Sequence, residues 1–239
     1  MFLTKQRPDL TNWLELIQSE GAFLLVDKEK DWTSFDVVAK LRRISKIKKI
    51  GHAGTLDPFA TGLLIVAVGR GATRQIDDFQ GLDKKYTGRI KLGSVTETYD
   101  SESEEINPKP IGHLTPENIE TVRQSFMGMQ MQKAPIYSAK KIKGKPLYKY
   151  ARKNQSVEVP LSEIEVKMFN INDVNLPFLG FELIVSKGTY IRSIANDFGE
   201  RLGCGAYLES LRRISIGDYC VEDAFKIKEI EELFVQTIS

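Results

Sequence analysis

The sequence predicts an α+β fold with a central mixed or antiparallel sheet that is flanked by helices. Apolar runs of strand length are interspersed irregularly with segments of helical periodicity. A doubly wound parallel sheet would need a regular alternation of strand and helix, which is not present. With 239 residues, 41% of them hydrophobic, the chain is long enough to bury an ordinary core.

The first elements follow from local signals. Residues 9–20 predict a short helix in an N-terminal extension (1–20) ahead of a single domain over 21–239. The run AFLLVD (22–27) has the length and apolarity of a strand. A helix is expected to begin at Thr33, because Thr33 and Asp36 form a capping-box-like pair before apolar residues at helical spacing. A loop rich in small residues (51–61) then precedes a buried strand over 63–69.

The remaining elements alternate irregularly. Residues 71–79 predict a helix, and 85–92 alternate as in a half-buried strand. A further helix should begin at Thr115, because a capping residue is followed there by Pro116 at the first helical position. The later segments are strands over 157–174 and 181–187, then helices over 196–202 and 223–236.

Composition excludes several classes of protein. No apolar run reaches the roughly 20 residues of a membrane span, and the N-terminus does not resemble a signal peptide. A cytoplasmic protein without membrane association is therefore expected. Two cysteines and two histidines, without the spacing of zinc ligands, predict neither a disulfide scaffold nor a metal site.

Basic residues are concentrated in two segments, although the net charge is only +2. Residues 40–49 contain six lysines and arginines and no acid, and residues 140–153 contain seven and no acid. Such segregation favours a polyanionic partner. The alternative is a pair of solvated surfaces, and charge alone does not separate the two interpretations.

The stretch GHAGTLDPFATG (51–62) is the most informative part of the chain. Its single acid, Asp57, precedes a proline and is surrounded by small residues that allow close approach of a ligand. A carboxylate on such a loop, between apolar strands, can be held rigidly in a cleft. The alternative is a structural turn in which Asp57 only accepts backbone hydrogen bonds.

The wider block GHAGTLDPFATGLLIVAVGRGATR (51–74) resembles the signature of the TruB family of pseudouridine synthases. Further blocks resemble the family in the same order over roughly residues 21–220: Asp27-Lys28 with Thr33-Ser34, Lys84-Lys85-Tyr86, Leu92-Gly93 with Thr96, Thr98 and Asp100, PIYSAK (135–140), LYKYAR (147–152), SKGTYIRS (186–193), Asp197 with Gly199, and Leu211-Arg212-Arg213. The resemblance implies the pseudouridine synthase fold, with RNA-binding loops around the sheet.

The resemblance also implies a reaction, the isomerisation of the T-loop uridine at position 55 of tRNA to pseudouridine. The C1′–N1 bond is broken and a C1′–C5 bond is formed, without redox change, so no cofactor is expected. Asp57 matches the family's catalytic aspartate, and a covalent role for a carboxylate divides a difficult step into easier ones. A non-catalytic tRNA chaperone with the same fold is the alternative function.

The resemblance assigns roles to six further residues. Arg192 is expected to act in catalysis as the cation beside Asp57, and Tyr86 as the ring that stacks on the flipped base. Tyr190 is expected to line the pocket, His52 to support the flipped state, and Leu211 to contact the base. Lys28 is a weaker candidate for a phosphate or loop contact. Considered singly, Arg192 would more often form a surface ion pair, and the two tyrosines would more often lie half-buried in a sheet. His52 and Leu211 would more often be packing residues.

Contact with tRNA is expected mainly through a basic arm at about 107–155. Its candidate phosphate contacts are Lys140, Lys141, Lys143 and Lys145. Departures from the family pattern are Glu29, Asp31, Glu97 and Ala134, which affect loop geometry more than chemistry. The chain leaves no room for a C-terminal PUA domain, so we expect a guide-RNA-independent enzyme, and a monomer.

Overall fold

The computed structural model describes residues 2–153 and 155–238. By its internal contacts the chain divides into two compact units. Unit 1 comprises Met1–Tyr86 and Arg212–Ser239, and unit 2 comprises Thr87–Leu211. Two strands, β5 (Lys84–Leu92) and β13 (Ala206–Ile216), begin in one unit and end in the other.

The strands of unit 1 are built around β4 (Thr61–Val68). It pairs antiparallel with β2 (Ala22–Lys28), from Ala22 opposite Val68 to Lys28 opposite Gly62. Strand β3 (Ile50–Ala53) also pairs antiparallel with β4, whereas β13 lies parallel to it at Arg212 and Arg213. The edges carry β1 (Phe2–Leu3), parallel to β2, and β14 (Tyr219–Cys220), antiparallel to β13.

Helices cover both faces of these strands, which explains the continuous apolar runs in β2 and β4. Leu24 and Val26 pack in one core with residues of α1 (Leu10–Ser19), α2 (Ser34–Ser45) and α8 (Ile227–Ile238). Phe23 and Leu25 point into a second core with residues of α3 (Arg70–Arg74) and α4 (Ile76–Gln80). Successive strand residues face opposite sides of a sheet, so a strand covered on both faces needs no polar alternation.

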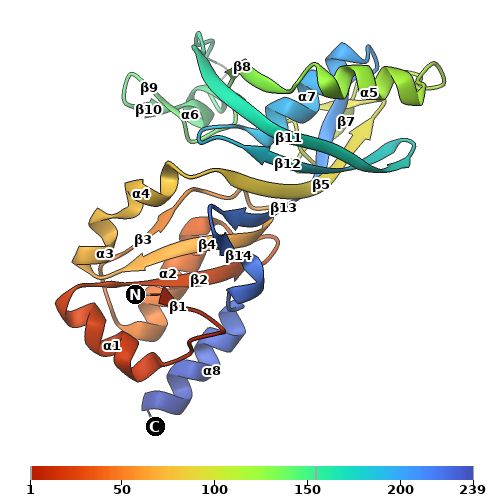
Figure 1. Cartoon of the computed structure of the whole chain (residues 1–239). Coiled ribbons are helices and arrows are strands. Elements are labelled where there is room, and N and C mark those ends of the chain that lie inside the picture. The colour runs from red at the N-terminus through yellow and green to blue at the C-terminus, as the bar shows by residue number, and fades with distance from the viewer. Residues whose placement is uncertain (1, 154, 239) are drawn as a thin grey trace. The chain divides into compact units, whose positions relative to one another are not determined.

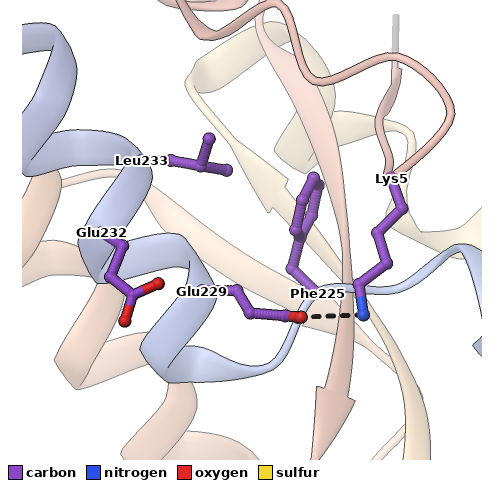
Figure 2. A pocket seen from close by; sticks show the side chains of 5 residues that line it. All are labelled: Lys5, Phe225, Glu229, Glu232 and Leu233. Atoms are coloured by element: carbon purple, nitrogen blue, oxygen red, sulfur yellow. Dashed lines mark ion pairs between the residues drawn. The ribbon is translucent and has the colours of Figure 1, made fainter.

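The N-terminal extension is packed into unit 1 by several contacts. The indole N–H of Trp13 donates to the carbonyl of Phe23 (2.9 Å), and its ring meets Phe234 of α8 edge-on. The Lys5 ammonium pairs with Glu229 of α8 at 3.0 Å, beside a shallow pocket that Phe225 also lines (Figure 2). The segment before β2 and the last helix therefore stabilise each other.

Unit 2 is dominated by long antiparallel strands. Strand β11 (Leu161–Asn175) pairs with β12 (Phe178–Val185) on one side and β8 (Gly128–Lys133) on the other. Four phenylalanines, from β11, β12, α7 (Ile191–Arg201) and the segment after α5 (Pro116–Gln124), form an aromatic core: Phe126, Phe169, Phe181 and Phe198. Unit 2 also contains four short strands and a short helix: β6 (Val95–Thr96), β7 (Glu105–Ile106), β9 (Lys141–Ile142), β10 (Lys145–Pro146) and α6 (Leu147–Ala151) (Figure 1).

The predicted α+β class with a mixed sheet is confirmed, because parallel and antiparallel pairs occur together. The capping box at Thr33 and Asp36 is also confirmed. Two local expectations were wrong: the helix over 71–79 is divided into α3 and α4, and α7 begins at Ile191 instead of 196. Strands β3, β8 and β13 are among the elements that were not predicted, and β3 overlaps the predicted loop over 51–61. Within residues 2–153 and 155–238, no helix is long and apolar enough to cross a membrane.

Candidate active site

Asp57 lies in the loop between β3 and β4. The backbone N–H of Ala60 donates to the Asp57 carbonyl (3.2 Å), which closes a turn with Pro58 in its second position. Proline is favoured there because its fixed φ matches the turn. Leu56 and Phe59 on either side are buried, whereas Asp57 is half-buried. The two apolar side chains anchor the loop and leave the carboxylate-bearing residue accessible.

Ser34, in the first turn of α2, holds this loop from one side. Its hydroxyl accepts a hydrogen bond from the backbone N–H of Leu56 (2.9 Å) and donates one to the Leu56 carbonyl (3.2 Å). Ser34 is buried, so water cannot readily replace either bond. The capping box at Thr33 fixes the start of the helix, and thereby the position of this hydroxyl.

Two buried cations hold the same loop through backbone carbonyls. Lys28 is 0% exposed, and its ammonium donates to the carbonyls of Pro58 (3.2 Å), Trp32 (2.6 Å) and Glu29 (3.0 Å). The ammonium thus acts as a structural donor to the loop.

Arg213, on β13, is 1% exposed and binds the other end of the loop. Its guanidinium donates to the carbonyls of Gly54 (3.1 Å) and Leu63 (2.7 Å). Gly62 has a φ of +103°, and a Cβ there would lie 2.2 Å from the Arg213 carbonyl oxygen. The close approach of β4 and β13 therefore requires glycine at this position.

His52 lies on β3, half-buried, a few residues before Asp57. Burial lowers the pKa of its imidazole, and the nearby charge of Arg213 lowers it further. Nδ1 is buried and has no hydrogen-bond partner among the residues that the structure describes. The surroundings of His52 therefore favour the neutral form of its imidazole.

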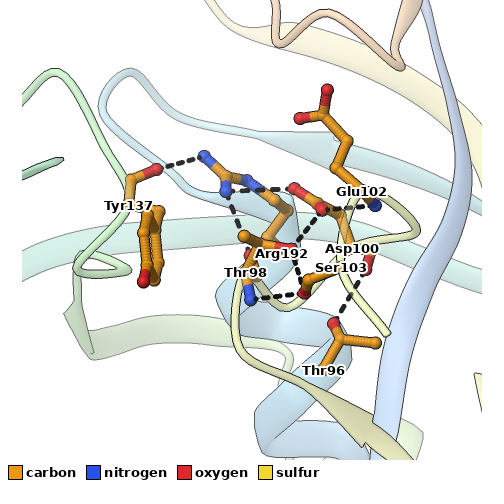
Figure 3. Close-up of polar contacts among 7 residues, drawn as sticks. All are labelled: Thr96, Thr98, Asp100, Glu102, Ser103, Tyr137 and Arg192. Carbon is orange, nitrogen blue, oxygen red and sulfur yellow. Dashed lines mark hydrogen bonds and ion pairs between the residues drawn. The ribbon is translucent and has the colours of Figure 1, made fainter. Parts of the chain in front are cut away.

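Arg192, in the first turn of α7, is the centre of a polar cluster in unit 2 (Figure 3). Its guanidinium donates to Asp100 Oδ2 (3.1 Å) and to the carbonyls of Thr98 (3.0 Å) and Tyr137 (3.0 Å). Both members of the ion pair are buried, with side chains 6% and 0% exposed. Buried charges require such partners, so Asp100 and the two carbonyls fix the direction of the guanidinium.

The backbone of Tyr190 is fixed by one buried glutamine of β8. The Gln132 carboxamide accepts from the Tyr190 N–H (2.8 Å) and donates to the Tyr190 carbonyl (3.0 Å). The hydroxyl of Ser193 donates to the carbonyl of Lys133 on the same strand (2.8 Å). The two bonds of Gln132 satisfy the N–H and the carbonyl of Tyr190 immediately ahead of the first helical turn, which favours a helix start at Ile191.

The predicted site residues are divided between the two units. Asp57, His52 and Lys28 lie together around the loop of unit 1, and buried Tyr86 is the last residue of that unit before β5 enters unit 2. The other three, Arg192, Tyr190 and buried Leu211, belong to unit 2. The described residues contain no group of three or more His, Cys, Asp or Glu side chains that could hold a metal ion.

A basic hollow of about 350 Å³ in unit 1 is lined by Lys49, Arg70, Thr73 and Arg74. Three cations and a hydroxyl, without an acid in the lining, suit an anionic group such as a phosphate. Lys49 belongs to the basic segment 40–49, whereas Arg70 and Arg74 were not singled out in the sequence. The fold brings these separate segments to one hollow.

The basic arm contains a tight hairpin of β9 and β10 in unit 2. Its turn residues Lys143 and Gly144 both have positive φ (50° and 78°), as a two-residue hairpin turn requires. Lys140 donates to Ser162, and Lys145 lies 4.1 Å from the centre of the Tyr150 ring. Lys141 and Lys143 are exposed.

Sequence reasoning missed the roles of three residues. Ser34, Asp100 and Arg213 all lie inside the matched blocks, but their partners are 22, 92 and 150 or more residues away in the chain. The sequence showed only that a serine, an aspartate and an arginine occur within matched blocks. The type of a residue does not identify the distant group to which it binds.

Comparison with known proteins gives the family. The profile of the TruB family pseudouridylate synthase N-terminal domain matches residues 42–191, and that of the tRNA pseudouridylate synthase B C-terminal domain matches 192–237. The chain belongs to the TruB family. It is thus a pseudouridine synthase, an isomerase, as the resemblance implied.

Two curated relatives match this TruB-family chain over most of their length. The tRNA pseudouridine synthase B of Chloroherpeton thalassium is 48% identical over 229 residues, covering 94% of this chain and 95% of the relative. The protein of the same name from Desulfotalea psychrophila is 49% identical over 209 residues, covering 85% of each. Among solved structures, a chain of a Cbf5–Nop10–Gar1 complex superposes with a TM-score of 0.71 at 25% identity, over 92% of this chain and 56% of that chain.

Proposed function

We propose that this chain converts the uridine at position 55 of the tRNA T-loop to pseudouridine, without a guide RNA, and that Asp57 is its catalytic carboxylate. The observation that carries the proposal is the loop of Asp57. Ser34, Lys28 and Arg213 bind the backbone of this loop at Leu56, Pro58 and Gly54. A catalytic group must be held in a defined position, and a loop fixed by three buried side chains meets that requirement.

The substrate class is supported by relatives of high identity named tRNA pseudouridine synthase B, and by the positive surfaces of the chain. The basic hollow and the lysines of the hairpin suit contacts to phosphates, which fix RNA in position without reading its sequence. The target uridine must leave its stack to reach a carboxylate, so the reaction requires a flipped base. In the proposal Tyr86 and Tyr190 contact that base.

The isomerisation needs no external group. The glycosidic C1′–N1 bond breaks, the base turns, C5 bonds to C1′, and the C5 proton is lost while N1 gains one. Asp57 acts as the covalent catalyst for this exchange. In the proposal Arg192 contributes a positive charge to the reaction, and Asp100 and two carbonyls hold its guanidinium in one orientation.

The test is an assay of an unmodified tRNA transcript with the purified chain and no other RNA. Conversion does not change mass, so carbodiimide labelling followed by primer extension detects the product. Asp57→Asn keeps the shape of the side chain and removes its charge, and Asp78→Asn, at an exposed acid on α4, is the matched control.

A single stop in the T-loop with wild type and Asp78→Asn, absent with Asp57→Asn, is the expected result. A stop elsewhere would refute the assignment of position 55 and keep the reaction. If no stop appears and the transcript is still bound, the chain is a tRNA-binding protein without this activity, and the proposal is wrong.

A further inference from the structure

The side chain of Phe35 is exposed in a place where packing does not require a phenylalanine. Its exposed fraction is 64%, at the second residue of α2. Among the large hydrophobic side chains that are strongly exposed in the described residues, it is the aromatic one; the others are methionine, leucine, isoleucine and valine. Single exposed hydrophobic residues are common, so the surroundings must decide whether this ring has a function.

Phe35 is tied to the loop of Asp57 through its neighbour. The Ser34 hydroxyl makes two hydrogen bonds to Leu56, the residue before Asp57. Two Cα–Cα steps of 3.8 Å and the hydrogen-bonded link between them place the Cα atoms of Phe35 and Asp57 at most roughly 15 Å apart. This distance corresponds to a few nucleotides. Phe35 is therefore within reach of the nucleotides next to a uridine that binds at Asp57.

Charged residues of α2 lie close to Phe35. Asp36 follows the ring directly, and its carboxylate accepts hydrogen bonds from the N–H and hydroxyl of Thr33. Farther along the same helix, the Arg42 guanidinium lies 6.0 Å from the ring centre and Arg43 is exposed. A base that stacks on the ring would thus have cations close by for its neighbouring phosphates.

We propose that Phe35 is a stacking platform for an unpaired base of the substrate RNA, next to or near the uridine that reacts. The inference rests on the proposed function, because it takes RNA as the substrate and Asp57 as the reacting group. An exposed ring beside a basic segment is the usual arrangement for binding unpaired bases, since every base has a π-face and the cations hold the backbone.

The experiment compares Phe35→Ala, Phe35→Leu and Phe35→Tyr with wild type, using the unmodified tRNA transcript. The dissociation constant is measured at equilibrium, and the rate of pseudouridine formation in single turnover at saturating enzyme. Val235→Ala is the matched control, because this residue of α8 is also an exposed hydrophobic side chain of unit 1 (66%). Thermal unfolding checks that each variant is folded.

Loss of stacking is expected to raise the dissociation constant of Phe35→Ala and Phe35→Leu by roughly 5- to 150-fold. The saturated rate and the unfolding temperature should stay near those of wild type. Phe35→Tyr should bind as wild type does, because it keeps a ring.

Three results would each refute a different part of the proposal. Binding by Phe35→Ala within twofold of wild type would refute the platform. Full recovery by Phe35→Leu would show a simple hydrophobic contact and refute stacking. If wild type forms no pseudouridine, the proposed function fails, and the binding constants still report independently on Phe35.

Discussion

The two hydrogen bonds of Ser34 make a quantitative prediction for Ser34→Ala. The substitution leaves the N–H and the carbonyl of Leu56 without their partner, in a place where Ser34 is 1% and Leu56 4% exposed. A buried polar group that loses its partner costs about 1–3 kcal/mol. For the two groups together we expect the free energy of unfolding to fall by about 3 kcal/mol.

The same substitution should affect catalysis separately from stability. For a chain of 239 residues, a loss of about 3 kcal/mol corresponds to a fall in Tm of about 6–12 °C. Because Leu56 precedes Asp57, a looser loop should lower kcat by roughly 10- to 100-fold. Binding of RNA, which does not depend on the exact position of the carboxylate, should change little.

Urea unfolding and single-turnover rates at 25 °C test this prediction, with Ser45→Ala as the control. Ser45 lies at the other end of the same helix, and its hydroxyl donates to the Leu41 carbonyl (2.7 Å). We expect the control to lose about 1 kcal/mol and to keep the wild-type rate. If Ser34→Ala loses stability and keeps kcat, Ser34 supports the fold but does not position Asp57, and the reasoning is refuted.

Three further predictions concern charges. Asp100→Asn removes the negative charge that faces buried Arg192, so stability to urea should fall by about 3 kcal/mol; a loss below about 1 kcal/mol would contradict a tight pair. Arg74→Glu should weaken RNA binding and reduce the slope of the logarithm of the binding constant against the logarithm of the salt concentration by about 1. An unchanged slope would exclude a phosphate contact at Arg74. Hydrogen bonds, first from Lys91, lower the pKa of Glu105 from 4.5 to about 2. The lowered pKa gives stability above pH 4.5 that is lost as the pH falls towards 2, so Glu105→Gln should be less sensitive to acid over this range; equal pH profiles would refute this assignment.

Local signals predicted the elements whose causes are local. The helix start at Thr33 depends on a residue three positions away, and the strand β2 on its own apolar run. The loop of Asp57 was identified from its small residues and its match to the family. What the sequence could not supply was the set of side chains that hold this loop, because Arg213 follows it by more than 150 residues.

The missed elements have long-range causes. Strand β13 contains the charged residues Glu209, Arg212 and Arg213, which interrupt the apolar pattern expected of a buried strand. Arg213 can be buried there because two distant carbonyls accept hydrogen bonds from its guanidinium. Helix α7 begins early because Gln132, 58 residues away, satisfies the backbone of Tyr190. The predicted roles of Tyr86, Tyr190, His52 and Leu211 remain predictions, as do the domain limits.

The order in which the ribosome makes the chain gives the Arg213 contact a consequence for timing. Ser34 and the Asp57 loop are synthesised early, whereas Arg213, which binds the loop at Gly54, follows Ser34 by roughly 180 residues. At 5–20 residues per second, the roughly 155 residues from Asp57 to Arg213 take about 8–30 s, during which the loop is present and this contact is missing. The Asp57 loop therefore lacks one of the three buried side chains that hold it until the segment of β13 has been made.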